Sequence, residues 1–226
     1  NADNILLCGE TGIVTKSELI ASIHTVLNGA TEEDTFVFYF SGHGGKNCLV
    51  LSDSLIDLQD LIDTIEQIQT RNKIVILDSC HSGGFALAGV PEIDIDETVE
   101  HFAGRGFAVL ASCGVEQFSG FNDDRGISLY TSFVCDALTS HFLIRQGKKS
   151  LETINEAIFR FAEVSNQKSG RNFQQPIFRS SIGGTVFFDV EEYNPYEVAR
   201  IYEETDKYII YAVEPVHHAG ATTLSV

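Results

Sequence analysis

The sequence predicts an α/β fold with a parallel or mostly parallel central sheet. The first observation is a set of three short apolar runs at residues 35–40, 74–77 and 107–111. Their β-branched and aromatic composition is typical of strands buried on both faces. The second is that helical patterns lie between and after these runs, and strands that alternate with helices indicate parallel pairing. At 226 residues, the chain is long enough for one substantial core with an appendage.

The first half of the chain begins with an apolar run at residues 4–8, followed by a helix. Apolar residues from Leu19 to Leu27 recur at helical spacing. Thr15 or Ser17 would cap this helix, and the Asn-Gly pair after it would end it. The elements expected next are a strand at 35–40, a short strand at 48–51, an amphipathic helix over 55–69 and a strand at 74–77.

The second half continues this alternation and then changes character. Residues 86–105 lack periodicity and are acidic, so we expect an exposed loop there. The elements expected after it are a strand at 107–111, helices at 128–143 and 151–165, and a last strand at 185–190. Beyond it lies an apolar run at 208–213, and a lone strand must join a sheet edge or open a further domain. We predict one domain over 1–190 and an acidic extension, or the start of another domain, over 191–226.

The charge and cysteine content exclude several classes of protein. Fifteen Lys and Arg against 32 Asp and Glu give a net charge of −17, which repels nucleic acid and anionic membranes and attracts basic peptides. No apolar run reaches the roughly 18–20 residues that span a bilayer. Five cysteines without a C-x-x-C pair argue against a disulfide scaffold or zinc ribbon, and they fit a reducing, cytoplasmic location. The start at Asn1 without any Met indicates a processed chain or a fragment.

Two of the predicted strands each end in a glycine-rich turn that carries a reactive side chain. These turns are Ser41-Gly42-His43-Gly44-Gly45 and Asp78-Ser79-Cys80-His81-Ser82-Gly83-Gly84. Carboxyl ends of parallel strands form the usual ligand-binding edge, so His43 and Cys80 face each other if the two strands are neighbours. An imidazole can take the proton of a thiol and later protonate a leaving amine. The backbone N–H groups of Gly44 and Cys80 can hold an oxyanion.

Each of these features also has a simpler interpretation. A lone His in a loop is more often structural, and a lone Cys at a strand end more often packs in the core. A glycine-rich turn can cradle phosphate, but the chain has neither Gly-Lys-Ser/Thr nor G-x-G-x-x-G. Metal binding by His43, Cys80 and His81 fits no known ligand spacing, so no metal is predicted there.

The stretches Phe38-Tyr39-Phe40-Ser41-Gly42-His43-Gly44-Gly45 and Leu77-Asp78-Ser79-Cys80-His81-Ser82-Gly83-Gly84 together resemble motifs of the caspase-like cysteine peptidases. The metacaspases and their bacterial relatives are the most similar. The resemblance extends to residues 111–119 and to Gln175-Pro176, and it covers residues 4–190. It implies the caspase-type three-layer α/β/α sandwich. It also implies that His43 is the general acid/base, that Cys80 is the nucleophile of peptide-bond hydrolysis through a thioester, and that the amides of Gly44 and Cys80 hold the oxyanion.

The resemblance further implies a basic cleavage specificity. In metacaspases, the acid two residues before the nucleophile and the serine two residues before the histidine line the first specificity pocket. Asp78 and Ser41 hold these positions here, and a carboxylate there would pair with Arg or Lys. Animal caspases cut after Asp and have Gln-Ala-Cys-x-Gly instead. Glu116 and Ser112 are further candidates for substrate binding. The alternative for Asp78 is a structural carboxylate that accepts backbone N–H bonds.

Partners, processing and cofactors follow from the same resemblance. Family members carry a strand and a helix before the segment that resembles residues 4–8, so a companion chain or domain is expected to supply the missing strand. Self-cleavage is expected at Arg105 in the acidic loop, with the basic stretch at 145–149 as a second candidate. No cofactor is expected. Calcium is the alternative, although acidic loops are usually only solvated; its candidate ligands are Asp94, Asp96, Asp123 and Asp124.

The sequence therefore predicts a cysteine endopeptidase that cuts proteins after Arg or Lys in a regulatory, defence or cell-death pathway. The competing hypothesis is a caspase-fold signalling or binding module with latent or no activity. The intact pair of His43 and Cys80 argues against that module, because inactive relatives often lose one of the two. A third alternative is acyl transfer to a non-peptide amide, which the same pair can perform.

Overall fold

The computed structural model describes residues 4–45, 48–67, 69–80, 106–112, 120–140, 144, 147–170, 174–190, 199–204, 209–213 and 222–225. The chain separates into two compact units. The first comprises Asn1–Ser140 with Ser150–Phe188, and the second comprises His141–Lys149 with Asp189–Val226. Both candidate motifs belong to the first unit. The domain boundary at residue 190 stays a prediction.

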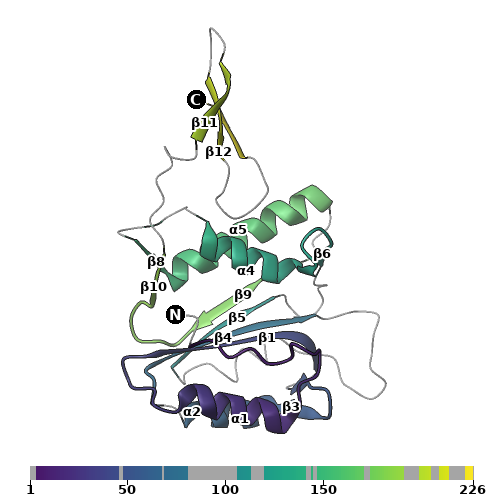
Figure 1. The fold of residues 1–226 in the computed structure, drawn as a ribbon, viewed down its shortest axis with the longest axis vertical. Helices are drawn as coiled ribbons and strands as arrows, with labels where there is room; N and C mark the ends of the chain where they lie inside the picture. The colour runs from purple at the N-terminus through teal and green to yellow at the C-terminus, as the bar shows by residue number, and fades with distance from the viewer. Residues whose placement is uncertain are drawn as a thin grey trace. The chain divides into compact units, whose positions relative to one another are not determined.

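A six-stranded mixed sheet forms the centre of the first unit. Its strands are β1 (Thr35–Gly45), β2 (Cys48–Val50), β3 (Leu55–Asp57), β4 (Asn72–Cys80), β5 (Phe107–Ala111) and β9 (Ile177–Ser180), and the helices around it are α1 (Lys16–Leu27), α2 (Leu58–Glu66), α4 (Leu129–Thr139) and α5 (Leu151–Ser169). The strand order is β3-β2-β1-β4-β5-β9, and β1, β4 and β5 form a parallel core. Figure 1 shows α1 and α2 on one side of the sheet and α4 and α5 on the other. The predicted α/β sandwich with a parallel core is confirmed, and the outer pairings of β2, β3 and β9 are antiparallel.

Each face of the sheet carries one hydrophobic cluster. Along β5, Phe107 and Val109 belong to the cluster that includes residues of α1 and α2, whereas Ala108 and Leu110 belong to the cluster that includes residues of α4 and α5. This alternation is the two-residue period of a strand. All four residues are buried, so the continuous apolar run is explained by a strand that is covered on both faces.

β1 and β4 extend beyond the predicted apolar runs. The prediction that His43 and Cys80 lie in turns after these strands is therefore wrong. The parallel register between the two strands is unbroken from the pair Thr35–Asn72 to the pair His43–Cys80. Ladder hydrogen bonds join backbone groups only, so the pairing continues where the apolar side chains stop. His43 and Cys80 therefore lie on strand ends rather than in turns, and β1 continues to Gly45.

Helix boundaries also differ from the prediction. The helix expected over 55–69 begins at Leu58, because β3 pairs with β2 and Asp57 caps α2 by accepting a 2.7 Å hydrogen bond from the Gln59 amide. Thr15, one of the two expected caps, accepts from the Glu18 amide at the start of α1. α4 ends at Thr139 rather than at residue 143, and α5 continues to Ser169, where Gly170 ends it with a φ of 65°.

The last strand of the sheet is β9, which the sequence analysis did not predict. The strand expected at 185–190 is β10 (Phe187–Asp189), which pairs with β8 (Lys148–Ser150) and not with the main sheet. In the second unit, β11 (Ala199–Glu204), β12 (Ile209–Val213) and β13 (Thr222–Ser225) form an antiparallel sheet. The run at 208–213 is thus the central strand of a small sheet and not a lone strand. No helix in the described ranges is long and apolar enough to cross a membrane.

One edge of β1 has no strand partner among the described residues. β1 pairs with β2 only at Gly44 and Gly45, so residues 35–43 are paired on the β4 side alone. The segment before α1 lacks regular structure at residues 5–9, and its Ile5 and Leu7 side chains are 75% and 69% exposed. An apolar segment without a strand to pair with cannot bury its side chains as part of a sheet.

Candidate active site

The parallel register places the two candidate catalytic residues on neighbouring positions at the carboxyl ends of β1 and β4. His43 is the Cα partner of Cys80, and neighbouring strands lie about 4.8 Å apart. His43 is exposed to solvent. The condition on which the sequence argument depended, that the two strands are neighbours, is therefore met. The same register pairs Ser41 with Asp78, the two residues expected to line the specificity pocket.

The glycines on either side of His43 place no side chain of their own beside it. A Cβ at Gly42 would lie 2.9 Å from Cζ of Phe40, so the Phe40 ring occupies the space that a side chain at residue 42 would need. Gly44 pairs with Leu49 as the chain passes from β1 into β2, and it is partly exposed. Its backbone is thus accessible beside His43, and its role in an oxyanion hole stays a prediction.

Asp78 is buried, with 1% of its surface exposed, and side chains at the start of α4 bind it. Ser128 Oγ and Thr131 Oγ1 both donate hydrogen bonds to Oδ2 of Asp78. The other carboxylate oxygen, Oδ1, is buried and has no hydrogen-bond partner among the described residues. A buried oxygen without a donor costs free energy. The donors that the structure describes are hydroxyl groups. The alternative role considered for Asp78, that of a structural carboxylate, had backbone amides as the donors.

The hydroxyl groups that bind Asp78 belong to a longer network. Ser128 is also the N-cap of α4, where its Oγ accepts a 3.0 Å hydrogen bond from the Thr131 amide. Tyr39 of β1 also bonds to Thr131, with 2.6 Å between the phenol oxygen and Thr131 Oγ1. Burial raises the pKa of the Tyr39 phenol, although hydrogen bonding to Thr131 opposes this effect. The phenol therefore stays protonated at neutral pH.

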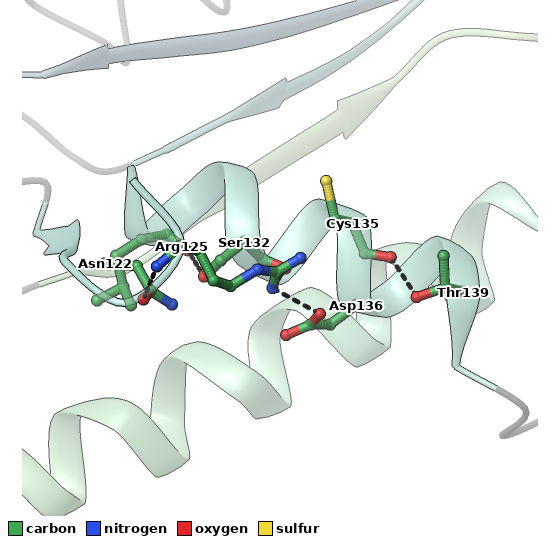
Figure 2. A network of polar contacts seen from close by, with 7 residues as sticks. Asn122, Arg125, Ser132, Cys135, Asp136 and Thr139 are labelled. Carbon is green, nitrogen blue, oxygen red and sulfur yellow. Dashed lines mark hydrogen bonds and ion pairs between the residues drawn. The ribbon is translucent and has the colours of Figure 1, made fainter. Parts of the chain in front are cut away.

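A short hairpin precedes α4 and is attached to it by an ion pair. The hairpin consists of β6 (Phe121–Asn122) and β7 (Ile127–Ser128). Figure 2 shows Arg125 of its turn reaching α4, where Nη1 lies 2.7 Å from Oδ1 of Asp136 and 3.4 Å from the Ser132 carbonyl oxygen. Partly exposed ion pairs contribute only about 0–1 kcal/mol to stability. We therefore attribute to this ion pair a role in positioning the hairpin, which ends at Ser128.

The remaining predicted site residues are distributed as follows. Ser41 is exposed, whereas Ser112 is fully buried and its Oγ donates to the Ser79 carbonyl oxygen at 3.3 Å. Asp123 and Asp124 are exposed in the hairpin turn, and no group of three His, Cys, Asp or Glu side chains in the described part of the chain is arranged to hold a metal ion. Of the stretch 145–149, Lys149 is buried. Residues that lie outside the described ranges are His81, Asp94, Asp96, Arg105 and Glu116.

Sequence analysis missed three residues of this site, namely Tyr39, Ser128 and Thr131. A signal for two of them was present. Tyr39 is the one polar side chain in the apolar run 35–40 apart from the leading Thr35, and Ser128 has the residue type of an N-cap directly before a helical pattern. The bonds of Ser128 and Thr131 to Asp78 span 50 and 53 residues of chain, and the bond between Tyr39 and Thr131 spans 92 residues. These contacts become visible only in the folded structure.

The comparison with known proteins agrees with this fold and site. The family model of the caspase domain matches residues 9–187, which is most of the chain and includes both strands with their candidate residues. The chain therefore belongs to the caspase family. Membership implies a cysteine peptidase whose substrates are proteins. No match was found among curated proteins.

Proposed function

We propose that the chain is a cysteine endopeptidase that hydrolyses peptide bonds after Arg or Lys, with Cys80 as nucleophile and His43 as general acid/base. The observation that carries this proposal is the register of β1 and β4, which makes His43 and Cys80 direct neighbours at the carboxyl edge of the sheet. A metacaspase-like subgroup and a regulatory, defence or cell-death pathway are part of the proposal, supported by the sequence around Cys80 alone.

The chemistry proceeds in two halves. The His43 imidazole takes the proton of the Cys80 thiol, and the thiolate attacks the substrate carbonyl carbon. The backbone amides of Gly44 and Cys80 stabilise the oxyanion, and loss of one such donor typically costs about 10²–10³ in rate. The imidazolium then gives its proton to the leaving nitrogen as the C–N bond breaks. In the second half, His43 takes a proton from a water molecule as the water oxygen attacks the thioester carbonyl carbon. The C–S bond then breaks, the acid product leaves, and the imidazolium returns its proton to the sulfur of Cys80.

Basic specificity is supported by the state of the Asp78 carboxylate. Its buried Oδ1 has no hydrogen-bond partner among the described residues, and a cationic side chain of the substrate would supply the missing donor. Ser41, the register partner of Asp78, is proposed to line the same pocket. Glu116 and Ser112 remain proposed substrate contacts; for Ser112, burial and the bond to the Ser79 carbonyl favour an indirect effect.

The test uses fluorogenic peptides that end in Arg, Lys or Asp. We expect hydrolysis of the Arg and Lys peptides and loss of at least about 10³ in kcat/KM for Cys80→Ala and for His43→Ala. Matched controls are Cys8→Ala, which removes a partly exposed free thiol, and His24→Ala on the exposed part of α1. Equal turnover by the wild type and Cys80→Ala would reject the mechanism, and preferential hydrolysis after Asp would reject the basic pocket. No hydrolysis of any peptide would favour a signalling module.

We further propose that the open edge of β1 accepts an additional strand from a companion chain or domain. The support is the absence of a described partner along residues 35–43 together with the exposed apolar side chains of residues 5–7. Amide hydrogen exchange on the chain by itself tests this. Amides of β1 that point away from β4 should exchange quickly, and uniform protection along β1 would contradict the proposal. Self-cleavage at Arg105 is a separate proposal, which N-terminal sequencing of active protein tests.

A further inference from the structure

We infer that Ser128 and Thr131, supported by Tyr39, are positioning residues that leave the Asp78 carboxylate one oxygen with which to bind the substrate. This inference rests on the proposed function. Ser128 and Thr131 both donate to Oδ2, and Oδ1 is buried without a partner in the described part of the chain. The two oxygens of the Asp78 carboxylate therefore differ in hydrogen bonding, although the group itself is symmetric.

The direction of the hydrogen bonds follows from counting protons. A hydroxyl has one proton to donate and can accept with its lone pairs. Thr131 uses its proton toward Asp78, so in the pair with Tyr39 its oxygen accepts and the phenol donates. Ser128 likewise donates to Asp78 and accepts from the Thr131 amide. The phenol of Tyr39 and the amide of Thr131 thus donate to the two hydroxyls, and both hydroxyls donate to Oδ2. Hydrogen bonds arranged in such chains strengthen one another.

A substrate cation consequently meets a single acceptor oxygen. The planar fork of a guanidinium gains its advantage over an ammonium by binding both oxygens of a carboxylate at once. Because Oδ2 is already occupied by two donors, this bidentate arrangement is unavailable. The site therefore treats an Arg side chain as a point charge, and the wild type should hydrolyse matched Arg and Lys peptides with kcat/KM values within about fivefold of each other.

The test changes the number of donors on Oδ2 and measures the ratio of kcat/KM for the Arg and Lys peptides. Thr131→Val removes one donor while it preserves the shape of the side chain. It should raise the Arg-to-Lys ratio by about fivefold or more, the effect of one ordinary hydrogen bond. Thr131→Ser keeps the hydroxyl and should restore the wild-type ratio. The matched control is Thr139→Val on the same helix, whose hydroxyl donates to the Cys135 carbonyl oxygen at 2.8 Å and is shown in Figure 2.

The outcomes separate this inference from the function on which it rests. If the wild type hydrolyses neither basic peptide, the proposed function fails and the inference fails with it. If the wild type is active and Thr131→Val changes both kcat/KM values equally, only the positioning role is overturned, because a merely structural defect lowers both alike. Should Thr131→Val not fold, Ser128→Ala removes the second donor and must shift the same ratio in the same direction; an unchanged ratio would overturn the inference.

Discussion

Removing the charge of Asp78 without removing its shape should separate specificity from stability. In Asp78→Asn, the amide oxygen at the Oδ2 position still accepts from Ser128 and Thr131. Hydrogen bonds to charged groups contribute about 1.5–3 kcal/mol and neutral ones about 0.5–1.5, so two of them lose about 2–3 kcal/mol in total. Relief from burying a carboxylate with an unpaired oxygen is worth several kcal/mol. The Nδ2 amide that takes the Oδ1 position is buried without an acceptor among the described residues, at about 1–3 kcal/mol. We therefore expect a free energy of unfolding within about 2 kcal/mol of the wild-type value.

The comparison variant is Asp78→Ala, which removes the acceptor itself. Two hydroxyl donors are then buried without a partner, at about 1–3 kcal/mol each, so stability should fall by about 2–6 kcal/mol. Urea unfolding in a Cys80→Ala background measures both values without interference from self-cleavage. In chains that retain Cys80, both substitutions of Asp78 should lower kcat/KM for cleavage after Arg and Lys by at least about 10². If Asp78→Asn is as unstable as Asp78→Ala, or retains Arg cleavage, Asp78 is a structural residue and the reasoning is refuted.

Two further predictions concern the scaffold. Ile56→Ala should lower the free energy of unfolding by about 2–4 kcal/mol, because Ile56 of β3 is completely buried in the cluster that includes residues of α1 and α2. Val26→Ala at a 40% exposed position of α1 should cost less than about 1 kcal/mol. For the second, burial lowers the pKa of Lys73, so the folded chain loses this proton at a lower pH than the unfolded chain does. Stability should then rise with pH as the pH approaches 10.5, and Lys73→Met should flatten that rise in urea unfolding measured across the range; an unaltered slope would contradict it.

The parallel core could be predicted from the sequence because burial on both faces requires a continuous apolar run. β5 shows this, since its odd and even residues contribute to different clusters. β9 was missed because Ile177 and Phe178 are followed by Arg179 and Ser180, a pattern without a clear period on an exposed sheet edge. Residues 55–57 continue the helical pattern of α2, and only pairing with β2 makes them a strand. In both cases tertiary contacts outweigh local preference.

The residues of the candidate site that could be predicted from the sequence are those that stand in glycine-rich motifs. His43 and Cys80 stand in short motifs with residue types that few structural roles require together, and the register then brought them side by side. Of the two donors to Asp78, Ser128 carried only the signal of an N-cap, and Thr131 carried none. Thr131 lies inside a helix in which every neighbour fits a helical pattern, and its hydroxyl gains a role only because it bonds to Asp78 of β4 in the folded chain. Long-range hydrogen bonds of this kind leave no local pattern in the sequence.

Under the proposed function, the position of the catalytic pair and the cleavage specificity depend on different elements. His43 and Cys80 are held by nine consecutive register pairs between β1 and β4, and this ladder is anchored in the core, with Val75 and Leu77 fully buried. Asp78 lies two residues before Cys80 on the same strand, yet its carboxylate is bound by Ser128 and Thr131 at the start of α4. The hairpin that precedes α4 is attached to this helix by the ion pair of Arg125 with Asp136. A shift of the hairpin or of α4 would therefore alter how the carboxylate meets a substrate and would leave the His43–Cys80 register intact. If the proposed function holds, mutations of the hairpin and α4 can therefore change cleavage specificity without disturbing the proposed pair of His43 and Cys80.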